Sequence, residues 1–230
     1  RYVSDGLNTA GYYYCPGDMM ATNPRWCQPV RVWRRYFRGW IEAPVPEAQM
    51  LASVMFDLRP MPDQIDPALI AKLEKVETAT VGHVLHSQFA DIGLRAVLPE
   101  KRVAGTAVTL RIPGADSTLL HHLMSLVRPG DFLVIDRCGD SHHACWGGVI
   151  TNAAKLGGVV GAVIDGPATD FNEVRRVGMP LWCRGPSPIT TKLLGLEGLL
   201  NGPVSVGGVS VEPGDAVLAD ESGVLFLKPW

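Results

Sequence analysis

Two places in this sequence combine residue types and spacing that suit chemistry. In GAVIDGPATDFNEV (residues 161–174), an apolar strand pattern ends at Asp165, a Gly-Pro turn follows, and Asp170 stands where the next helix is expected to begin. A carboxylate at such a junction can bind a hard cation or act as an acid or base. It can equally be the N-cap of its own helix, and the sequence leaves both alternatives open.

The second place is the helix start at Gly147 and Gly148, which follows the strand pattern FLVID and the loop RCGDSHHAC. Without side chains there, the backbone N–H groups of Gly148, Val149 and Ile150 can face outward and bind a carboxylate or phosphate. The alternative is that the glycines only permit close packing against a strand. Parallel strands bring their carboxyl ends to one edge, so both junctions can open into one crevice that suits Mg²⁺ or Mn²⁺ holding a 2-oxo acid.

Other candidate groups have weaker patterns. His142 and His143 suggest zinc, but adjacent histidines rarely bind one ion and no third ligand follows at helical spacing. Cys145 is either a nucleophile beside a histidine or a small buried thiol, and the buried thiol is favoured. His121 and His122 are expected to be a core or rim pair of a helix.

Composition narrows the function classes. The chain has 230 residues and a net charge of −2, which argues against binding to nucleic acid or to an anionic membrane. No run of about 18 apolar residues exists, so no membrane span is expected. The 5 cysteines form no CxxC pair, which favours reduced thiols and a cytoplasmic protein.

The elements that must position these residues follow from hydrophobic periodicity and turn signals. Helices are expected at 66–76, 78–89, 116–127, 146–156 and 170–178, and strands at 102–112, 131–136, 159–165 and 180–185. The tail 204–227 alternates strand patterns with Pro-Gly and Asp-Glu-Ser-Gly turns. Strands that alternate with helices, followed by hairpins, predict an α/β fold with a mixed sheet.

The composition changes near residue 50. All 5 tyrosines lie at or before Tyr36, and the stretch RVWRRYFRGW is basic and aromatic, whereas aliphatic residues and glycine dominate later. We therefore expect residues 1–49 to be an N-terminal extension, whose order the sequence does not fix, and residues 50–230 to be the domain. The extension is either an arm for nucleic acid or a protein partner, or a surface segment, and the second is favoured.

The stretch PGDFLVIDRCGDSHHACWGGVITNAAKLGGVVGAVIDGPATDFNEVRRVGMPLWCRG resembles the RraA-like family, as do RVAGTAVTL before it and GGVSVEPGDAVLADESGV after it. That family includes class II pyruvate aldolases acting on 4-hydroxy-4-methyl-2-oxoglutarate and 4-carboxy-4-hydroxy-2-oxoadipate, and the regulator of ribonuclease activity. The resemblance covers roughly residues 56–226. It implies a swivelling β/β/α-type domain with a mixed central sheet, a divalent metal, and trimers or hexamers with sites near subunit interfaces.

The resemblance also implies site roles. The family's aldolases carry an aspartate, twenty intervening residues and then Arg-Asp; the matching positions here are Gly148 and the pair Thr169 and Asp170. Asp170 matches the metal-binding aspartate, and the backbone of Gly147 to Ile150 matches the segment that binds the pyruvoyl carboxylate. Thr169 replaces the arginine that binds substrate and stabilises the enolate. Gly148 replaces the aspartate that holds metal-bound water.

These replacements predict impaired aldol cleavage, since losing one donor that faces a developing oxyanion commonly costs about 10² to 10³ in rate. Arg137 is expected to supply charge from the other side, with His142 or His143 as acid or base. The favoured function is a divalent-metal lyase that releases pyruvate from a small 2-oxo or hydroxy dicarboxylic acid, by retro-aldol cleavage or by decarboxylation as of oxaloacetate. The alternatives are a non-catalytic regulatory protein of the ribonuclease-regulator kind, or a divergent lyase or isomerase that uses Arg137 and the histidine pair.

Overall fold

The computed structural model describes residues 31–32, 35, 38–39, 59–196 and 198–229. The chain divides into two compact units, Arg1–Ala52 and Ser53–Trp230. The few described residues of the first unit are helical. The expected boundary after residue 49, and most of the N-terminal extension, lie outside the described residues.

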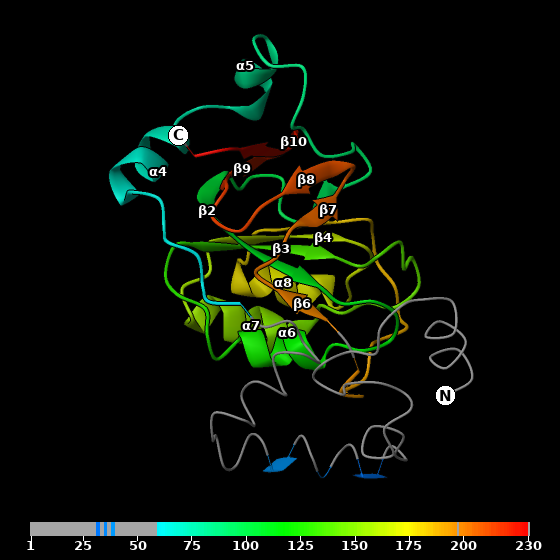
Figure 1. Ribbon diagram of the computed structural model, residues 1–230. Coiled ribbons are helices and arrows are strands. Elements are labelled where there is room, and N and C mark those ends of the chain that lie inside the picture. Colours follow the sequence, from blue (N-terminus) through cyan, green and yellow to red (C-terminus); the bar gives the residue numbers. More distant parts are fainter. Residues whose placement is uncertain (1–30, 33–34, 36–37, 40–58, 197, 230) are drawn as a thin grey trace, which may run out of the picture. The chain divides into compact units, whose positions relative to one another are not determined.

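A mixed sheet is the framework of the second unit (Figure 1). Its strands lie in the order β1 (Arg95–Ala96), β5 (Leu181–Cys183), β4 (Gly161–Asp165), β3 (Asp131–Asp136), β2 (Val103–Arg111), β9 (Ala216–Asp220) and β10 (Gly223–Leu227), and β6 (Leu199–Leu200) also pairs with β2. Strands β2 to β5 pair in parallel, and β1, β6, β9 and β10 pair antiparallel. The α/β fold with a mixed central sheet is confirmed.

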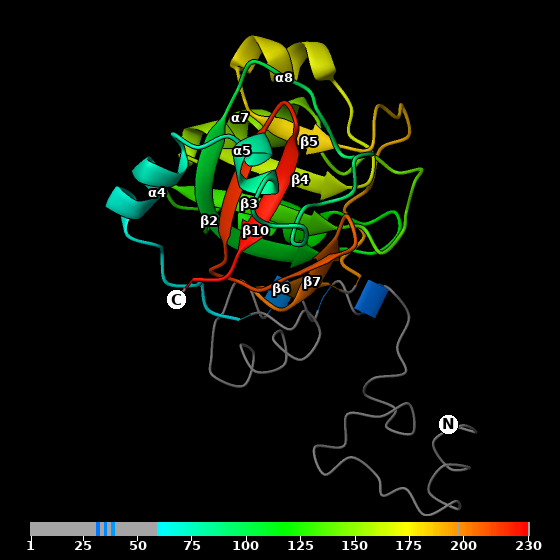
Figure 2. The same cartoon turned by 90° about the horizontal axis from the view of Figure 1, so that it is seen from above.

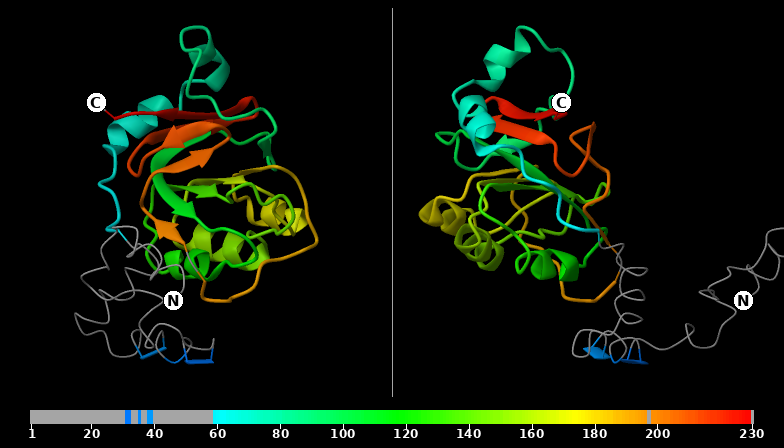
Figure 3. Two further views of the ribbon diagram at one scale, coloured as in Figure 1. Left: turned by 45° about the vertical axis from the view of Figure 1, so that its right-hand side comes forward. Right: turned by 60° about the vertical axis from the view of Figure 1, so that its left-hand side comes forward.

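The parallel strands are buried because both faces of the sheet are covered. In β3 the residues from Asp131 to Ile135 are all buried, which explains why the sequence there is a continuous apolar run and does not alternate. On one face lie α6 (Thr118–Leu123), α7 (Gly148–Leu156) and α8 (Phe171–Val177) (Figures 1 and 3). Each helix buries one apolar side in a core cluster that includes Leu120, Ile150 and Val174.

The second face of the sheet packs against more β structure. Seen from above, β10 runs at an angle to β3 and β4, so the sheet turns back over its own parallel part (Figure 2). A separate hairpin of β7 (Val204–Val206) and β8 (Val209–Val211) completes this layer. Its core cluster includes Phe132 and Trp182, whose ring centroids are 6.0 Å apart.

Two carboxylates tie the hairpin to the ends of the parallel strands. Asp136 ends β3 and Asp165 ends β4, and the two are partners in register. Asp136 Oδ2 accepts a hydrogen bond from Ser205 N at 3.3 Å, and Asp165 Oδ2 accepts one from Gly207 N at 2.7 Å. These two carboxylates therefore serve the junction between the layers.

Two helices are shorter than the periodicity suggests. The segment expected at 78–89 forms only α5 (Thr78–Gly82), because β-branched residues open it and a glycine ends it. The helix expected at 116–127 is regular only over Thr118–Leu123. In contrast, α4 (Pro67–Leu73) has the expected N-cap, because Asp66 Oδ1 accepts a hydrogen bond from Ala68 N at 2.8 Å. Within the described residues, no helix has the length and apolar character needed to cross a bilayer.

Candidate functional site

A cavity of about 380 Å³ lies where the two predicted junctions meet. Its walls come from the loops that follow the parallel strands and from the irregular segment between β5 and β6. It is lined by Ser117, His121, Ala144, Cys145, Gly147, Gly148, Val149, Ile150, Thr169, Asp170, Thr190, Thr191, Lys192 and Leu193. The structure thus brings together all six of the predicted residues at the glycine helix start and the Thr-Asp pair.

The backbone holds the two junctions side by side. Thr169 N donates to Trp146 O at 2.8 Å, and the indole of the buried Trp146 donates to Thr151 Oγ1 at 2.9 Å inside α7. Helix α7 is thereby anchored with its first turn facing the cavity. Within the described part of the chain, the N–H groups of Val149 and Ile150 meet no acceptor, as is usual for the first turn of a helix.

Asp170 occupies the N-cap position of α8, but its carboxylate does not cap that helix. Its backbone is left-handed, with φ 55° and ψ 39°, a conformation that aspartate and asparagine adopt more readily than most residues. This turn directs the carboxylate across the gap, where Oδ2 accepts a hydrogen bond from Gly148 N at 2.8 Å. Oδ1 has only Thr169 Oγ1 nearby, at 3.4 Å, so one carboxylate oxygen is available to a ligand.

Gly147 is required by this close approach. A Cβ built on Gly147 would lie 2.8 Å from Asp170 Oδ2 and 2.9 Å from Thr169 Cγ2, which is too close for either atom. A Cβ on Gly148 would lie 3.1 Å from Glu173 Cγ, a tight contact, and 3.5 Å from Asp170 Oδ2, an ordinary one. Gly147 therefore permits a close approach of Thr169 and Asp170, and not the packing against a strand that was considered.

Lys192 brings a positive charge to the cavity that sequence analysis missed. Its backbone is held on both sides, because Lys192 N donates to Ala115 O at 2.7 Å and Lys192 O accepts from Ser117 N at 3.0 Å. The side chain is exposed at the cavity wall. No periodicity or motif marks the segment after β5, so nothing local in the sequence identifies this lysine.

Asp116 fixes the segment that carries Lys192. The buried carboxylate accepts hydrogen bonds from Leu194 N at 3.0 Å and Leu196 N at 2.7 Å, and also from the backbone and hydroxyl of Thr118. Burial alone raises the pKa of Asp116, but these hydrogen bonds to the charged form outweigh it and hold the pKa below its ordinary value. The ionised form of Asp116 therefore stabilises this wall.

His121 also lines the cavity, at its exposed rim. Its Nδ1 lies 2.9 Å from Ser117 O. A carbonyl oxygen can only accept, so in the neutral imidazole Nδ1 carries the hydrogen and Nε2 keeps a free electron pair. Of the two expected positions, core or rim, His121 occupies the rim. Its free Nε2 can accept a proton, a role that its position in a helix did not suggest.

Arg137, expected to supply charge, does not line the cavity. Its side chain is fully buried, with Nη1 donating to Ile112 O at 2.6 Å and Nη2 lying 3.1 Å from Asp140 Oδ2. Backbone carbonyls of the neighbouring loop and Asp140 accept the hydrogen bonds of its Nη groups. Arg137 is therefore committed to loop contacts and is not among the residues that line the cavity.

His142 and His143 are likewise absent from the cavity wall. Both backbone N–H groups donate to Asp140 Oδ1, at 2.8 and 3.1 Å, and His143 Nδ1 lies 2.8 Å from Asp140 Oδ2. Among the described residues, no group of three or more His, Cys, Asp or Glu side chains could hold a metal ion.

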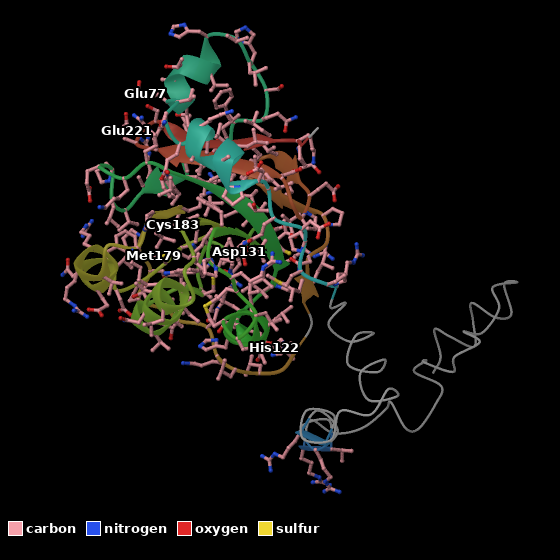
Figure 4. The ribbon with its side chains drawn as sticks, turned by 90° about the vertical axis from the view of Figure 1, so that its left-hand side faces the viewer. Glu77, His122, Asp131, Met179, Cys183 and Glu221 are labelled. Atoms are coloured by element: carbon pink, nitrogen blue, oxygen red, sulfur yellow. The ribbon has the colours of Figure 1, made fainter. Side chains whose placement is uncertain are left out.

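Cys145 lies in the cavity wall but is buried. Burial raises the pKa of its thiol to about 11, so the thiolate is scarce at neutral pH. Cys183 and Met179 lie in the interior (Figure 4), and burial raises the pKa of the Cys183 thiol too. A cysteine nucleophile is therefore disfavoured, as expected.

Comparison with known families agrees with this geometry. The RraA-like profile, described as Aldolase/RraA, matches residues 78–226, which is more than half of the chain and includes the whole cavity. The chain belongs to this family. A second profile, described as "Putative nucleotidyltransferase DUF294", matches residues 1–47, which lie almost entirely outside the described residues.

Relatives and solved structures extend the likeness to the RraA-like family. A "Putative 4-hydroxy-4-methyl-2-oxoglutarate aldolase" of Halalkalibacterium halodurans is 35% identical over 126 residues, which cover 55% of this chain and 60% of that protein. The "4-hydroxy-4-methyl-2-oxoglutarate aldolase" of Thermus thermophilus is 33% identical, covering 64% of this chain and 85% of that protein. The match therefore spans about three fifths of the length of the first relative.

Among solved structures, the crystal structure of Streptomyces coelicolor RraAS2 is similar, with a TM-score of 0.64 and 31% identity, and the match covers 71% of this chain and 86% of that one. RraAS2 is described as an unusual member of the RNase ES inhibitor RraA protein family. The names of similar proteins include aldolases and inhibitors of RNA processing.

Proposed function

We propose that this RraA-like protein is a lyase that cleaves a small 2-oxo dicarboxylic acid and releases pyruvate, by retro-aldol cleavage or by decarboxylation. The observation that carries the proposal is the cavity that unites Asp170, the open first turn of α7 and Lys192. Each of these groups suits one part of such a substrate. The relatives named as 4-hydroxy-4-methyl-2-oxoglutarate aldolases support the same reaction type.

The donor set fits Mg²⁺ or Mn²⁺. Among the described residues that line the cavity, Asp170 provides the one carboxylate, and its Oδ1 is available. Mg²⁺ commonly binds proteins through one or two carboxylates and takes its remaining ligands from water and substrate, whereas structural zinc requires several nitrogen or sulfur ligands. When bound, the cation supplies Lewis-acid stabilisation of the negative charge on the 2-oxo group.

The protein's own groups bind and orient the substrate. The N–H groups of Val149 and Ile150, at the positive end of α7, bind the carboxylate next to the 2-oxo group. Lys192 supplies the positive charge that Thr169 lacks, from a different segment of the chain. In this arrangement the side chain faces the distal carboxylate or the developing enolate.

For a 4-hydroxy-2-oxo acid, His121 can take the proton. The C3–C4 bond breaks, its electron pair forms the pyruvate enolate, and the C4 hydroxyl proton moves to Nε2 of His121 as a carbonyl forms at C4. The enolate is then protonated at C3. Oxaloacetate requires less, because breaking its C3–C4 bond releases CO₂ and no hydroxyl proton has to be removed.

The test is pyruvate release from oxaloacetate and from 4-hydroxy-4-methyl-2-oxoglutarate, with and without Mg²⁺ or Mn²⁺. Asp170→Asn is the decisive variant, because asparagine keeps the left-handed backbone and the acceptor for Gly148 N but removes the charge. Asp66→Asn is the matched control, an aspartate at the N-cap of another seven-residue helix. Metal-dependent turnover that Asp170→Asn abolishes and Asp66→Asn retains supports the proposal; wild-type protein that neither binds Mn²⁺ nor turns over either substrate refutes it.

A second candidate is a non-catalytic binding protein, favoured by Thr169 and Gly148, which stand where the resemblance places an arginine and an aspartate. The similarity to RraAS2, from a family named for inhibition of RNase ES, supports the same candidate. The double variant Thr169→Arg with Gly148→Asp separates the two candidates, since the nearest atom to a Cβ at position 148 is Glu173 Cγ, a side-chain atom at 3.1 Å. A rise in aldol cleavage shows an intact lyase scaffold, whereas a folded, metal-binding and inert double variant favours the binding protein.

We include a trimeric or hexameric assembly in the proposal. Val149 and Leu193 line the cavity and are 75% and 62% exposed, and apolar side chains so placed suit contact with a second subunit. Sedimentation velocity of the purified protein measures the assembly. A monomer at all concentrations contradicts this part of the proposal and leaves the lyase assignment untouched.

A further inference from the structure

Arg137 is a buried cation with an unusual set of partners. Its side chain is fully buried, Nη1 donates to Ile112 O at 2.6 Å, and Nη2 donates to Gly114 O and lies 3.1 Å from Asp140 Oδ2. Its Nε has no partner within the described residues. Burial of a guanidinium is costly unless its donors are satisfied, so a side chain retained in this position calls for a role.

The contacts of Arg137 join three loops that follow neighbouring parallel strands. Ile112 and Gly114 belong to the loop after β2, and Asp140 belongs to the loop after β3. The turn after β4 packs directly on the arginine stem, because a Cβ on Gly166 would lie 2.6 Å from Arg137 Cγ. That turn continues to Thr169 and Asp170, three and four residues after Gly166, in the cavity wall.

The loop after β2 leads from Arg137 to the lysine. One residue after Gly114, Ala115 O accepts the hydrogen bond from Lys192 N at 2.7 Å. Two residues further on, Ser117 lines the cavity and donates its N–H to Lys192 O at 3.0 Å. The backbone that Arg137 binds is therefore the backbone that places Lys192.

We propose that Arg137 is a positioning residue that holds the Lys192 wall of the cavity against the Asp170 wall. It acts through the carbonyls of the loop after β2 on one side and through the turn at Gly166 on the other. Its planar fork of donors can bind two carbonyls and a carboxylate together in a fixed geometry. The importance of Lys192 in this inference rests on the proposed function, but the mechanical coupling does not.

Hydrogen exchange tests the coupling without any activity. In Arg137→Met, the amides of Lys192 and Ser117 should exchange about 10- to 100-fold faster, because the hydrogen bonds of the charged donor are lost. The peptide covering β9 and β10 should exchange at its wild-type rate. A purely structural role would accelerate exchange evenly across the unit, and that result, or no change at Lys192, overturns the proposal.

Arg128→Met is the matched control. Arg128 also pairs with an aspartate three residues later, with Nη2 3.2 Å from Asp131 Oδ1, and also donates to a loop carbonyl, Pro62 O, at 2.8 Å. Its removal should accelerate exchange near residues 62–64 and 128–131 and leave Lys192 unaffected. Equal acceleration at Lys192 in both variants would show general loosening and contradict a specific role for Arg137.

A second variant keeps the test decisive if Arg137→Met does not fold. Gly166→Ala retains the arginine and every donor but forces a Cβ against its stem. Overpacking of this kind should accelerate exchange at Lys192 by about 5- to 10-fold while the control peptide is unchanged. Wild-type exchange at Lys192 in a folded Gly166→Ala refutes the coupling.

Steady-state kinetics provide a test of the coupling that is independent of hydrogen exchange. Arg137→Met should lower kcat/KM for pyruvate release by about 10- to 100-fold in the wild-type background, but by less than about twofold in a Lys192→Met background, because the two act as one unit. Full additivity overturns the inference. If the wild-type protein has no turnover, the proposed function fails and the exchange measurements alone decide on Arg137.

Discussion

Replacing Gly147 with alanine tests the central geometry of the site with a single methyl group. The added Cβ would lie 2.8 Å from Asp170 Oδ2 and 2.9 Å from Thr169 Cγ2, whereas ordinary contact begins at 3.4 Å. Both groups must therefore retreat by about 0.5 to 0.6 Å. The backbone is no obstacle, because φ −149° and ψ −162° are extended values that alanine adopts freely.

This retreat acts on the bond that orients the carboxylate. Moving Oδ2 away weakens its 2.8 Å hydrogen bond from Gly148 N and rotates Oδ1 from its position in the cavity. Misplacement of a reacting group by about 1 Å can cost about 10²-fold, and disturbance of groups that orient a metal ligand costs about 10- to 100-fold. We therefore expect Gly147→Ala to lower Mn²⁺ affinity, and kcat/KM for pyruvate release, by about 10- to 100-fold.

The neighbouring glycine is the control. In Gly148→Ala the Cβ meets Glu173 Cγ at 3.1 Å, where the half-buried side chain has to give by a few tenths of an ångström, and Asp170 Oδ2 at an ordinary 3.5 Å. We expect Mn²⁺ affinity within about twofold of wild type. Because Gly148 opens α7, alanine there should also raise the free energy of unfolding by about 0.5 kcal/mol.

Mn²⁺ titration by calorimetry, initial rates of pyruvate release and urea unfolding of both variants make the comparison. The reasoning is refuted if Gly147→Ala binds Mn²⁺ and turns over like wild type while remaining folded. It is also refuted if the two alanine variants lose affinity equally, since the carboxylate orientation would then not depend on the close approach at Gly147.

Three further predictions follow from the same wall of the cavity. Lys192→Met should raise the KM of a dicarboxylic substrate by about 10- to 100-fold, measured by initial rates, because a charged hydrogen bond is lost; an unchanged KM contradicts its role. Iodoacetamide at pH 8 should label the exposed Cys138 and leave Cys145 unlabelled, as measured by mass spectrometry, because burial raises the pKa of the Cys145 thiol to about 11. Rapid labelling of Cys145 would contradict its burial. The pKa of Asp116 in the folded protein lies below its ordinary value, so its carboxylate stabilises the fold above about pH 4, and this stabilisation is lost as pH falls through the folded pKa. When the free energy of unfolding is measured against pH, Asp116→Asn should therefore lose less stability on the acid side than wild type. An acid-side dependence equal to that of wild type would show that Asp116 titrates normally.

The sequence predicted the fold where periodicity and turn chemistry agree. The strand at 131–136 and the helix from Gly148 have unbroken apolar patterns and clear starts, and both were placed within a few residues. The end of the helix at Gly82 was missed because the apolar pattern continues to Val84 and Leu85, which are exposed in the structure. The glycine was a local signal for that end, and the apolar pattern was given more weight.

The candidate site was predictable from the sequence only where its chemically active groups directly follow a strand. Asp170 and the glycine pair were identifiable as candidates because parallel strands bring their carboxyl ends to one edge, although a helix cap and close packing remained as alternatives. Lys192 was missed because its segment has no regular structure and reaches the cavity through hydrogen bonds to Ala115 and Ser117. Arg137 lies at the expected junction, but its side chain is buried and binds backbone carbonyls. The sequence does not distinguish an arginine that is buried in this way from one that faces the cavity.

The left-handed backbone of Asp170 limits which substitutions this position tolerates. Most residues are disfavoured there by about 1 to 2 kcal/mol, whereas asparagine and glycine, like aspartate, fit the turn. Exchange of the carboxylate for the amide of asparagine would therefore leave the loop undisturbed and remove only the proposed metal ligand. Alanine or glutamate would instead oppose the turn itself, whatever the protein does.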